Sequence, residues 1–275
     1  MKKLIPCFLL LLAFGAKAQN FEGTIKWSMK MEITDPATKA KMEEAAKRMS
    51  DPAMQARMKE MQSKMNDPQM KSMMDNNPQM KAQMEGAMKM MQGGDLSSMI
   101  PKGFTIRIKG QNTRTKMEGG AMAMEILYLK DKDQAYSLDR QNKTYSPLTG
   151  NNSTQGSTST PPKVTKTSET TKILNYICTK YIVEIKEGDR TIQESIWATT
   201  EIKDIDLKSL AKQKMGRGQS IFYEGVEGVP LRVEMNMTEG NTTMEVIEIK
   251  RESLSAADFS IPSDFKETQG MMGKF

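Results

Sequence analysis

A methionine-rich segment separates two regions of strand-like sequence in this chain. Residues 35–94 are rich in Met, Lys, Ala and Gln, with no aromatic residue and almost no β-branched one. This composition favours helix, whereas the residues before and after it alternate between apolar and polar side chains, as strands do. The chain is therefore expected to be mainly β with a helical insertion, an α+β arrangement.

Helices in the insertion are expected to begin at a recurring dipeptide. Pro36, Pro52 and Pro68 each follow Asp at intervals of 16 residues, and Pro78 follows Asn. Asp or Asn can cap free N–H groups at a helix start, and Pro at the first helical position loses nothing by lacking its own N–H. Helices this short are marginal alone in water, so they need a surface to pack on.

Turn residues divide the remaining sequence into short strands. We expect a strand over 21–33, a meander over 125–147, and a hairpin of 174–186 with 190–199. A further strand around 231–237 has one polar face, and the apolar phase of its partner slips between Val246 and Ile247, which predicts a bulge. These strands predict a largely antiparallel sheet with one buried face.

The whole domain is expected to extend over residues 19–275 as one β-rich unit. It is interrupted by the insertion over 35–94 and by a flexible loop over 149–162, which is rich in Ser, Thr, Asn, Gly and Pro. The insertion and a helix expected over 204–214 are the two candidates for covering the buried face of the sheet.

Residues 1–18 are typical of a cleaved signal peptide. Lys2 and Lys3 precede a short apolar run, and the small residues of Ala16-Lys17-Ala18 suit cleavage before Gln19. We expect a periplasmic or secreted protein of the Gram-negative envelope, with no transmembrane segment after cleavage.

The sequence lacks the residues that most catalytic and metal sites need. There is no His, so Ser-His-Asp and Cys-His sites and His-ligated metals are excluded, and Cys178 is the only cysteine expected after cleavage. Phosphate-binding loops and C-x-x-C pairs are absent, and the net charge of +6 is not gathered into a basic cluster with aromatics. We therefore expect a non-enzyme without catalytic residues, resident metal or cofactor, and no binding of nucleic acid.

The methionines of the insertion are the predicted ligand-binding residues. They fall at helical spacing on apolar stripes. The stripe residues predicted to line a site are Met54, Met58, Met61, Met65, Met80, Met84 and Met88. Three interpretations stay open: packing against the sheet, an adaptable surface for a lipid or peptide, and soft-metal binding, since thioethers favour Cu(I).

The C-terminal half resembles a known family. The stretch from Ile173 to Tyr181, ILNYICTKY, is followed by Ile196-Trp197-Ala198-Thr199, by Gly228-Val229-Pro230-Leu231-Arg232 and by the ending DFSIPSDF from Asp258 to Phe265. This order resembles an uncharacterised secreted bacterial family, the domain of unknown function numbered 4412. The resemblance covers roughly residues 21–33 and 104–266, so the Met-rich segment looks like an expanded insertion.

The ending is also similar, more remotely, to the periplasmic lipoprotein-carrier superfamily typified by LolA and LolB. That resemblance implies an open antiparallel half-barrel whose concave apolar face holds acyl chains beneath a helical lid. The expected function is non-catalytic binding of an apolar ligand, such as a lipid or a lipoprotein acyl chain. The alternatives are copper binding through Met pairs and a structural envelope protein without a small ligand, and the oligomeric state stays open.

Overall fold

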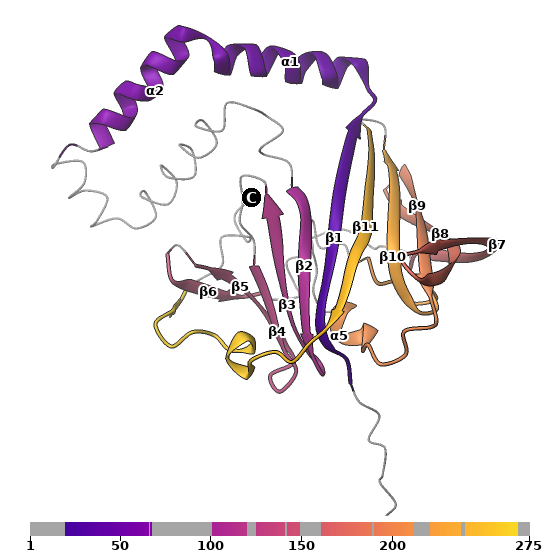
Figure 1. The fold of residues 1–275 in the computed structure, drawn as a ribbon. Helices are drawn as coiled ribbons and strands as arrows, with labels where there is room; N and C mark the ends of the chain where they lie inside the picture. The colour runs from indigo at the N-terminus through magenta and orange to yellow at the C-terminus, as the bar shows by residue number, and fades with distance from the viewer. Residues whose placement is uncertain are drawn as a thin grey trace, which may run out of the picture.

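The protein is described by a computed structural model over residues 20–65, 67, 101–119, 125–140, 142–148, 161–188, 190–211, 221–237 and 240–268. Its strands form one sheet (Figure 1). In chain order the strands are β1 (Glu22–Ile33), β2 (Pro101–Lys109), β3 (Asn112–Gly119), β4 (Glu125–Leu129), β5 (Gln134–Asp139), β6 (Thr144–Pro147), β7 (Lys163–Ile173), β8 (Tyr176–Glu187), β9 (Arg190–Thr199), β10 (Val229–Met237), β11 (Gly240–Arg251) and β12 (Lys266–Glu267). The helical elements are α1 (Pro36–Ser50), α2 (Pro52–Met65), α5 (Leu207–Ala211) and the 3₁₀ helix η2 (Ala256–Phe259).

The sheet is open and almost entirely antiparallel. Its strand order is β12-β6-β5-β4-β3-β2-β1-β11-β10-β9-β8-β7, and only the short β12 runs parallel to its neighbour. The two outermost strands in this order, β12 and β7, do not pair with each other. The predicted mainly β fold with an open antiparallel half-barrel is therefore confirmed.

Several local predictions are confirmed in detail. Strand β9 has the bounds expected from the sequence, β8 and β9 form the predicted hairpin, and β4, β5 and β6 form the predicted meander. Lys26 of β1 pairs with Glu248, whereas its neighbour Trp27 pairs with Val246, so Ile247 is the extra residue of the predicted bulge. The polar strand β7 was not predicted, because it lacks an apolar alternation.

The helix starts expected at Asp-Pro are also confirmed for the first two repeats. The Asp35 carboxylate accepts a hydrogen bond from the backbone N–H of Thr38 at 2.6 Å, and α1 begins at Pro36. The Asp51 carboxylate accepts from the N–H of Ala53 at 2.7 Å at the start of α2. The Pro68 and Pro78 repeats lie outside the described residues, as do residues 1–19 and most of the predicted loop, 149–160.

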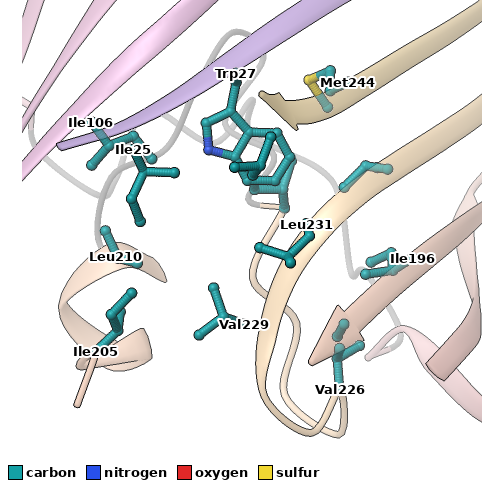
Figure 2. Packing of buried hydrophobic residues seen from close by; sticks show 14 of the residues in the cluster. Ile25, Trp27, Ile106, Ile196, Ile205, Leu210, Val226, Val229, Leu231 and Met244 are labelled. Atoms are coloured by element: carbon teal, nitrogen blue, oxygen red, sulfur yellow. The ribbon is translucent and has the colours of Figure 1, made fainter. Parts of the chain in front are cut away.

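We call the side of the sheet that carries the main hydrophobic core the inner face. Alternate residues of the central strands meet there, because side chains two apart on a strand point the same way. Among them are Ile25, Trp27, Phe104, Ile106, Ile108, Tyr181, Val183, Ile196, Val229, Leu231, Val233, Met244 and Val246. Side chains from β1 and β2 point toward those from β9 and β10 across the curved sheet (Figure 2).

One end of the inner face is closed. Helix α5 and the loops around it cover the end at which β1 begins, with Ile205 and Leu210 packed against Ile25 and Val229 (Figure 2). The helix predicted over 204–214 is shorter among the described residues, spanning only Leu207–Ala211. At the opposite end, α1 continues directly from β1 and runs with α2 beyond the sheet (Figure 1).

The opposite side of the sheet, the outer face, has a smaller core beneath the C-terminal segment. Leu254 and Phe259 pack on side chains of β4 and β5, including Leu127 and Leu138. An ion-pair network holds this segment in place. Its members are Arg107, Arg114, Glu125, Arg140 and Asp258.

Candidate functional site

Every methionine in the described strands lies on the inner face. Met29 of β1 pairs directly with Met244 of β11, and the other positions follow from the registers of β1, β3, β10 and β11. The six are Met29, Met31, Met117, Met235, Met237 and Met244. We call this set the methionine end, because it occupies the end of the inner face opposite α5, where β1 and β10 finish and β11 starts.

Burial decreases along the methionine end toward the edge of the sheet. Met244 is 5% exposed, whereas Met31 and Met237 are 46% and 44% exposed. Met29 and Met235 lie between these extremes and pack against the main core. The core is thus sealed at the α5 end and opens gradually into an accessible apolar surface at the other end.

Tryptophan and phenylalanine form the floor beside these methionines. The rings of Trp27 and Phe104 stack with centroids 5.3 Å apart and planes 15° apart, and both side chains are buried. The indole Nε1 of Trp27 is buried and has no hydrogen-bond partner among the described residues. The indole Nε1 of Trp197 is likewise buried and unpaired, so this feature alone assigns no ligand to the methionine end.

A buried carboxyl interrupts this apolar surface. Glu194 of β9 is opposite Met235 of β10 and Val183 of β8, and its residue is 2% exposed. The hydroxyl of Tyr223 donates a hydrogen bond to Glu194 Oε2 at 2.9 Å. Burial raises the pKa of Glu194, and the bond from Tyr223 only partly opposes that rise.

Backbone hydrogen bonds lie in the plane of the sheet, and side chains cover the inner face at the methionine end; beyond Ser28, β1 pairs only with β11 among the described residues. A ligand on this face therefore meets side chains, and those of the methionine end are thioethers, which are weak hydrogen-bond acceptors. Such a surface suits a molecule with few polar groups.

Cys178, the one cysteine among the described residues, is not a reactive group of this site. Cys178 is fully buried, and burial raises the pKa of its thiol to about 11. The thiol is therefore protonated near neutral pH, and only a thiolate is a good nucleophile.

A separate hollow of about 700 Å³ opens near η2, lined by residues that include Leu129 and Phe259. The cations at its wall already have partners, because Lys109 contacts Glu22 at 2.5 Å and Lys132 lies over the ring of Tyr136 at 5.7 Å. We assign no ligand to this hollow.

The structure places few of the methionines that the sequence predicted as ligand-binding. Met54 lies on α2 and is 39% exposed, beyond the edge of the sheet (Figure 1). Met58, Met61 and Met65 belong to α2, but their side chains are outside the description. Met80, Met84 and Met88 lie outside the described residues, so the predicted lining stays a prediction.

The methionine end was not predicted from the sequence, although a signal for it is present. Met29 and Met31 are two residues apart in one strand, as are Met235 and Met237, which places each pair on one strand face. What the sequence could not show is that β1 and β11 are neighbours, since they lie more than 200 residues apart.

Two features of the described residues concern metal binding and membrane spanning. These residues contain no cluster of three or more Cys, Asp or Glu side chains that could hold a metal ion. None of the helices in the described part of the chain has the length and apolar character needed to span a bilayer.

Comparisons with known proteins give one family and several distant structures. The family described as domain of unknown function (DUF4412) matches residues 84–265, which is more than half of the chain. The matched range begins inside the Met-rich segment and leaves β1 outside it. No curated protein matches the sequence.

Among solved structures, PNGF-II is 15% identical with a TM-score of 0.39; the match covers 62% of this chain and 29% of that one. The chain thus spans less than a third of PNGF-II. An uncharacterized conserved protein from Thermus thermophilus is 8% identical with a TM-score of 0.36, over 61% of this chain and 83% of that one. LprF from Mycobacterium bovis is 11% identical with a TM-score of 0.25, over 62% and 85% of the two chains. At these identities none of the likenesses carries a function across.

Proposed function

We propose that this chain, which belongs to the DUF4412 family, is an exported, non-catalytic binding protein that holds an aliphatic chain on its methionine end. The observation that carries the proposal is the gathering of the six methionines of the described strands on one face, with exposure rising toward its open end. Large apolar side chains exposed next to one another mark binding surfaces in water-soluble domains.

An aliphatic chain suits this surface better than an extended peptide does. A peptide lying flat on this face would bury its own N–H and C=O groups against thioethers, and each unpaired group would cost free energy. A lipid tail has no such groups, and each CH₂ that it buries contributes about 0.8 kcal/mol. Methionine side chains are flexible, so they can pack around tails of different length and shape.

The insertion adds a means of covering a bound chain. It joins the end of β1 to the start of β2, so both of its attachment points lie at the methionine end. The chain that carries the residues predicted as lining, from Met54 to Met88, therefore leaves the sheet and returns to it at the proposed site. The same attachment points are consistent with an alternative function. In it, the insertion itself packs on the methionine end and no small ligand binds.

Uptake of a fluorescent apolar probe such as N-phenylnaphthylamine tests the proposal. We expect the double variant Met31→Gln and Met237→Gln to weaken uptake several-fold, because it places polar amides at the open end. Ile247→Gln is the matched control, since Ile247 is 55% exposed and is the bulged residue outside the β1–β11 pairing. Equal uptake by the double variant and the wild type would contradict the proposal.

Native mass spectrometry of the chain from Gln19 onward, purified without detergent, identifies the natural occupant. An added mass in the lipid range supports the proposal. A bare protein that also takes up no probe would refute it and favour a structural role for the insertion and the sheet.

Soft-metal binding is a second candidate because the strand register places two methionines opposite each other. Met29 and Met244 are directly opposite each other, and Met235 is on the next strand, so three thioethers lie on neighbouring strands of one face. Side chains at such cross-strand positions can contact one another, and thioethers favour Cu(I). Added mass of copper after incubation with Cu(I), lost in the Met29→Leu and Met244→Leu double variant, would favour this candidate.

A further inference from the structure

Glu194 is an unusual residue to find beside the methionine end. It lies in strand β9 between Ile192 and Ile196, which point to the same face, and its cross-strand neighbours are Val183 and Met235. A buried carboxyl costs free energy unless its hydrogen bonds are made, so its presence among apolar side chains calls for an explanation.

Only one of the two carboxylate oxygens of Glu194 accepts a hydrogen bond from a described residue. Tyr223 bonds to Oε2, whereas the described residues supply no partner to Oε1. The groups that face Glu194 from β8 and β10 are apolar, and the titratable ones nearby are Tyr223 itself and Tyr181, one cross-strand pair away. The Tyr181 hydroxyl is directed to Glu227, which pairs with Lys166, so the described surroundings offer Glu194 no cation.

We propose that Glu194 and Tyr223 form the polar anchor of the site, and that they select aliphatic ligands ending in an amine over those ending in a carboxylate. This inference rests on the proposed function, because it names the head group of the molecule whose chain lies on the methionine end. The ammonium group would bond to Oε1 of Glu194, while Tyr223 holds Oε2.

Charge decides the selectivity. A buried carboxylate without a cation is compensated by an incoming ammonium, and hydrogen bonds between charged groups are stronger than neutral ones. A ligand carboxylate would place a second negative charge beside Glu194. A hydroxyl can bond to Oε1 without changing the net charge, so alcohols should rank between amines and acids.

Competition among ligands of equal chain length tests the anchor. Decylamine, decanol and decanoic acid are each used to displace N-phenylnaphthylamine, below the concentrations at which they form micelles. We expect decylamine to displace the probe at a concentration roughly tenfold or more below that of decanoic acid. Glu194→Gln should lose this difference between decylamine and decanoic acid, each compared with the variant's own affinity for the probe, and Tyr223→Phe should reduce the difference.

The matched control is Glu248→Gln, because Glu248 is 42% exposed and pairs with Lys26 on the outer face. This variant should keep the wild-type order of ligands. If Glu194→Gln fails to fold, the wild type alone decides the matter. Its preference for decylamine over decanol should then grow as pH rises and Glu194 ionises, because an ammonium pairs with a carboxylate more strongly than a hydroxyl does.

The outcomes separate the two proposals. If the wild type binds the probe but treats amine and acid alike, the binding function stands and the anchor is refuted. An equal amine preference in Glu194→Gln also refutes the anchor. If no apolar probe binds at all, the binding function itself fails.

Discussion

The ion pairs of Glu125 on the outer face allow a quantitative prediction about stability. Glu125 contacts Arg114 at 2.7 Å and Arg140 at 2.9 Å, and its side chain is only 5% exposed. Arg114 is 16% exposed and also contacts the carboxylate of Asp258 at 3.6 Å, whereas Arg140 is 47% exposed. The two arginines therefore contact the same carboxylate, but Arg114 is largely shielded from solvent whereas Arg140 is not.

Glu125→Gln should lower the free energy of unfolding by about 3 kcal/mol. Removing one partner of a buried ion pair costs about 3–5 kcal/mol, and the low end applies because Asp258 still faces Arg114. Arg140→Gln should cost less than about 1 kcal/mol, since water already screens that charge. Urea titrations near neutral pH with unchanged m-values measure both effects.

The pH dependence provides a second test of the same ion pairs. Burial alone would raise the pKa of Glu125, but Arg140 and Arg114 outweigh it, so the pKa lies below its ordinary value of 4.5. The stabilisation is then fully present above that value and is lost as pH falls through the lowered pKa. Equal losses for Glu125→Gln and Arg140→Gln at every pH would refute the argument from burial.

Three further predictions concern the inner face. Because burial raises the pKa of Glu194, wild-type stability should fall as pH rises above 4.5 through the raised pKa; Glu194→Gln should flatten this fall in a series of thermal melts. Ile196→Ala should cost about 2–5 kcal/mol in urea unfolding, because Ile196 is fully buried between Tyr181 and Val233. Mild peroxide should oxidise the exposed Met31 and Met237 to polar sulfoxides and reduce probe uptake, with reversal by a methionine sulfoxide reductase; uptake unchanged despite oxidation confirmed by mass would contradict the site.

Local features of this fold could be predicted from the sequence because each has a local physical cause. Asp35 and Asp51 cap helices through their own side chains, and the slip between Val246 and Ile247 is visible in the alternation of one strand. Strand β7 lacks such a signal, since as an edge strand it is mostly exposed and has no apolar face to reveal.

The site depends on long-range pairing, and so most of it could not be predicted. The helical spacing of methionines in the insertion was conspicuous, whereas the strand methionines are scattered over three regions of the sequence. Only the neighbouring positions of β3, β2, β1, β11 and β10 bring them together. Likewise, nothing in the sequence around Glu194 distinguishes it from more exposed glutamates in other strands, such as Glu248 of β11.

The central place of β1 in the sheet has a consequence for how the chain folds. Its first strand pairs with β11, and a side-chain hydrogen bond from Thr24 to Glu252 spans 228 positions of the sequence. Such distant contacts raise the contact order, and chains of high contact order fold slowly. The core cannot be completed until nearly the whole chain has been synthesised. A protein exported through a narrow channel as an extended chain, as the predicted signal peptide implies, would benefit from this delay.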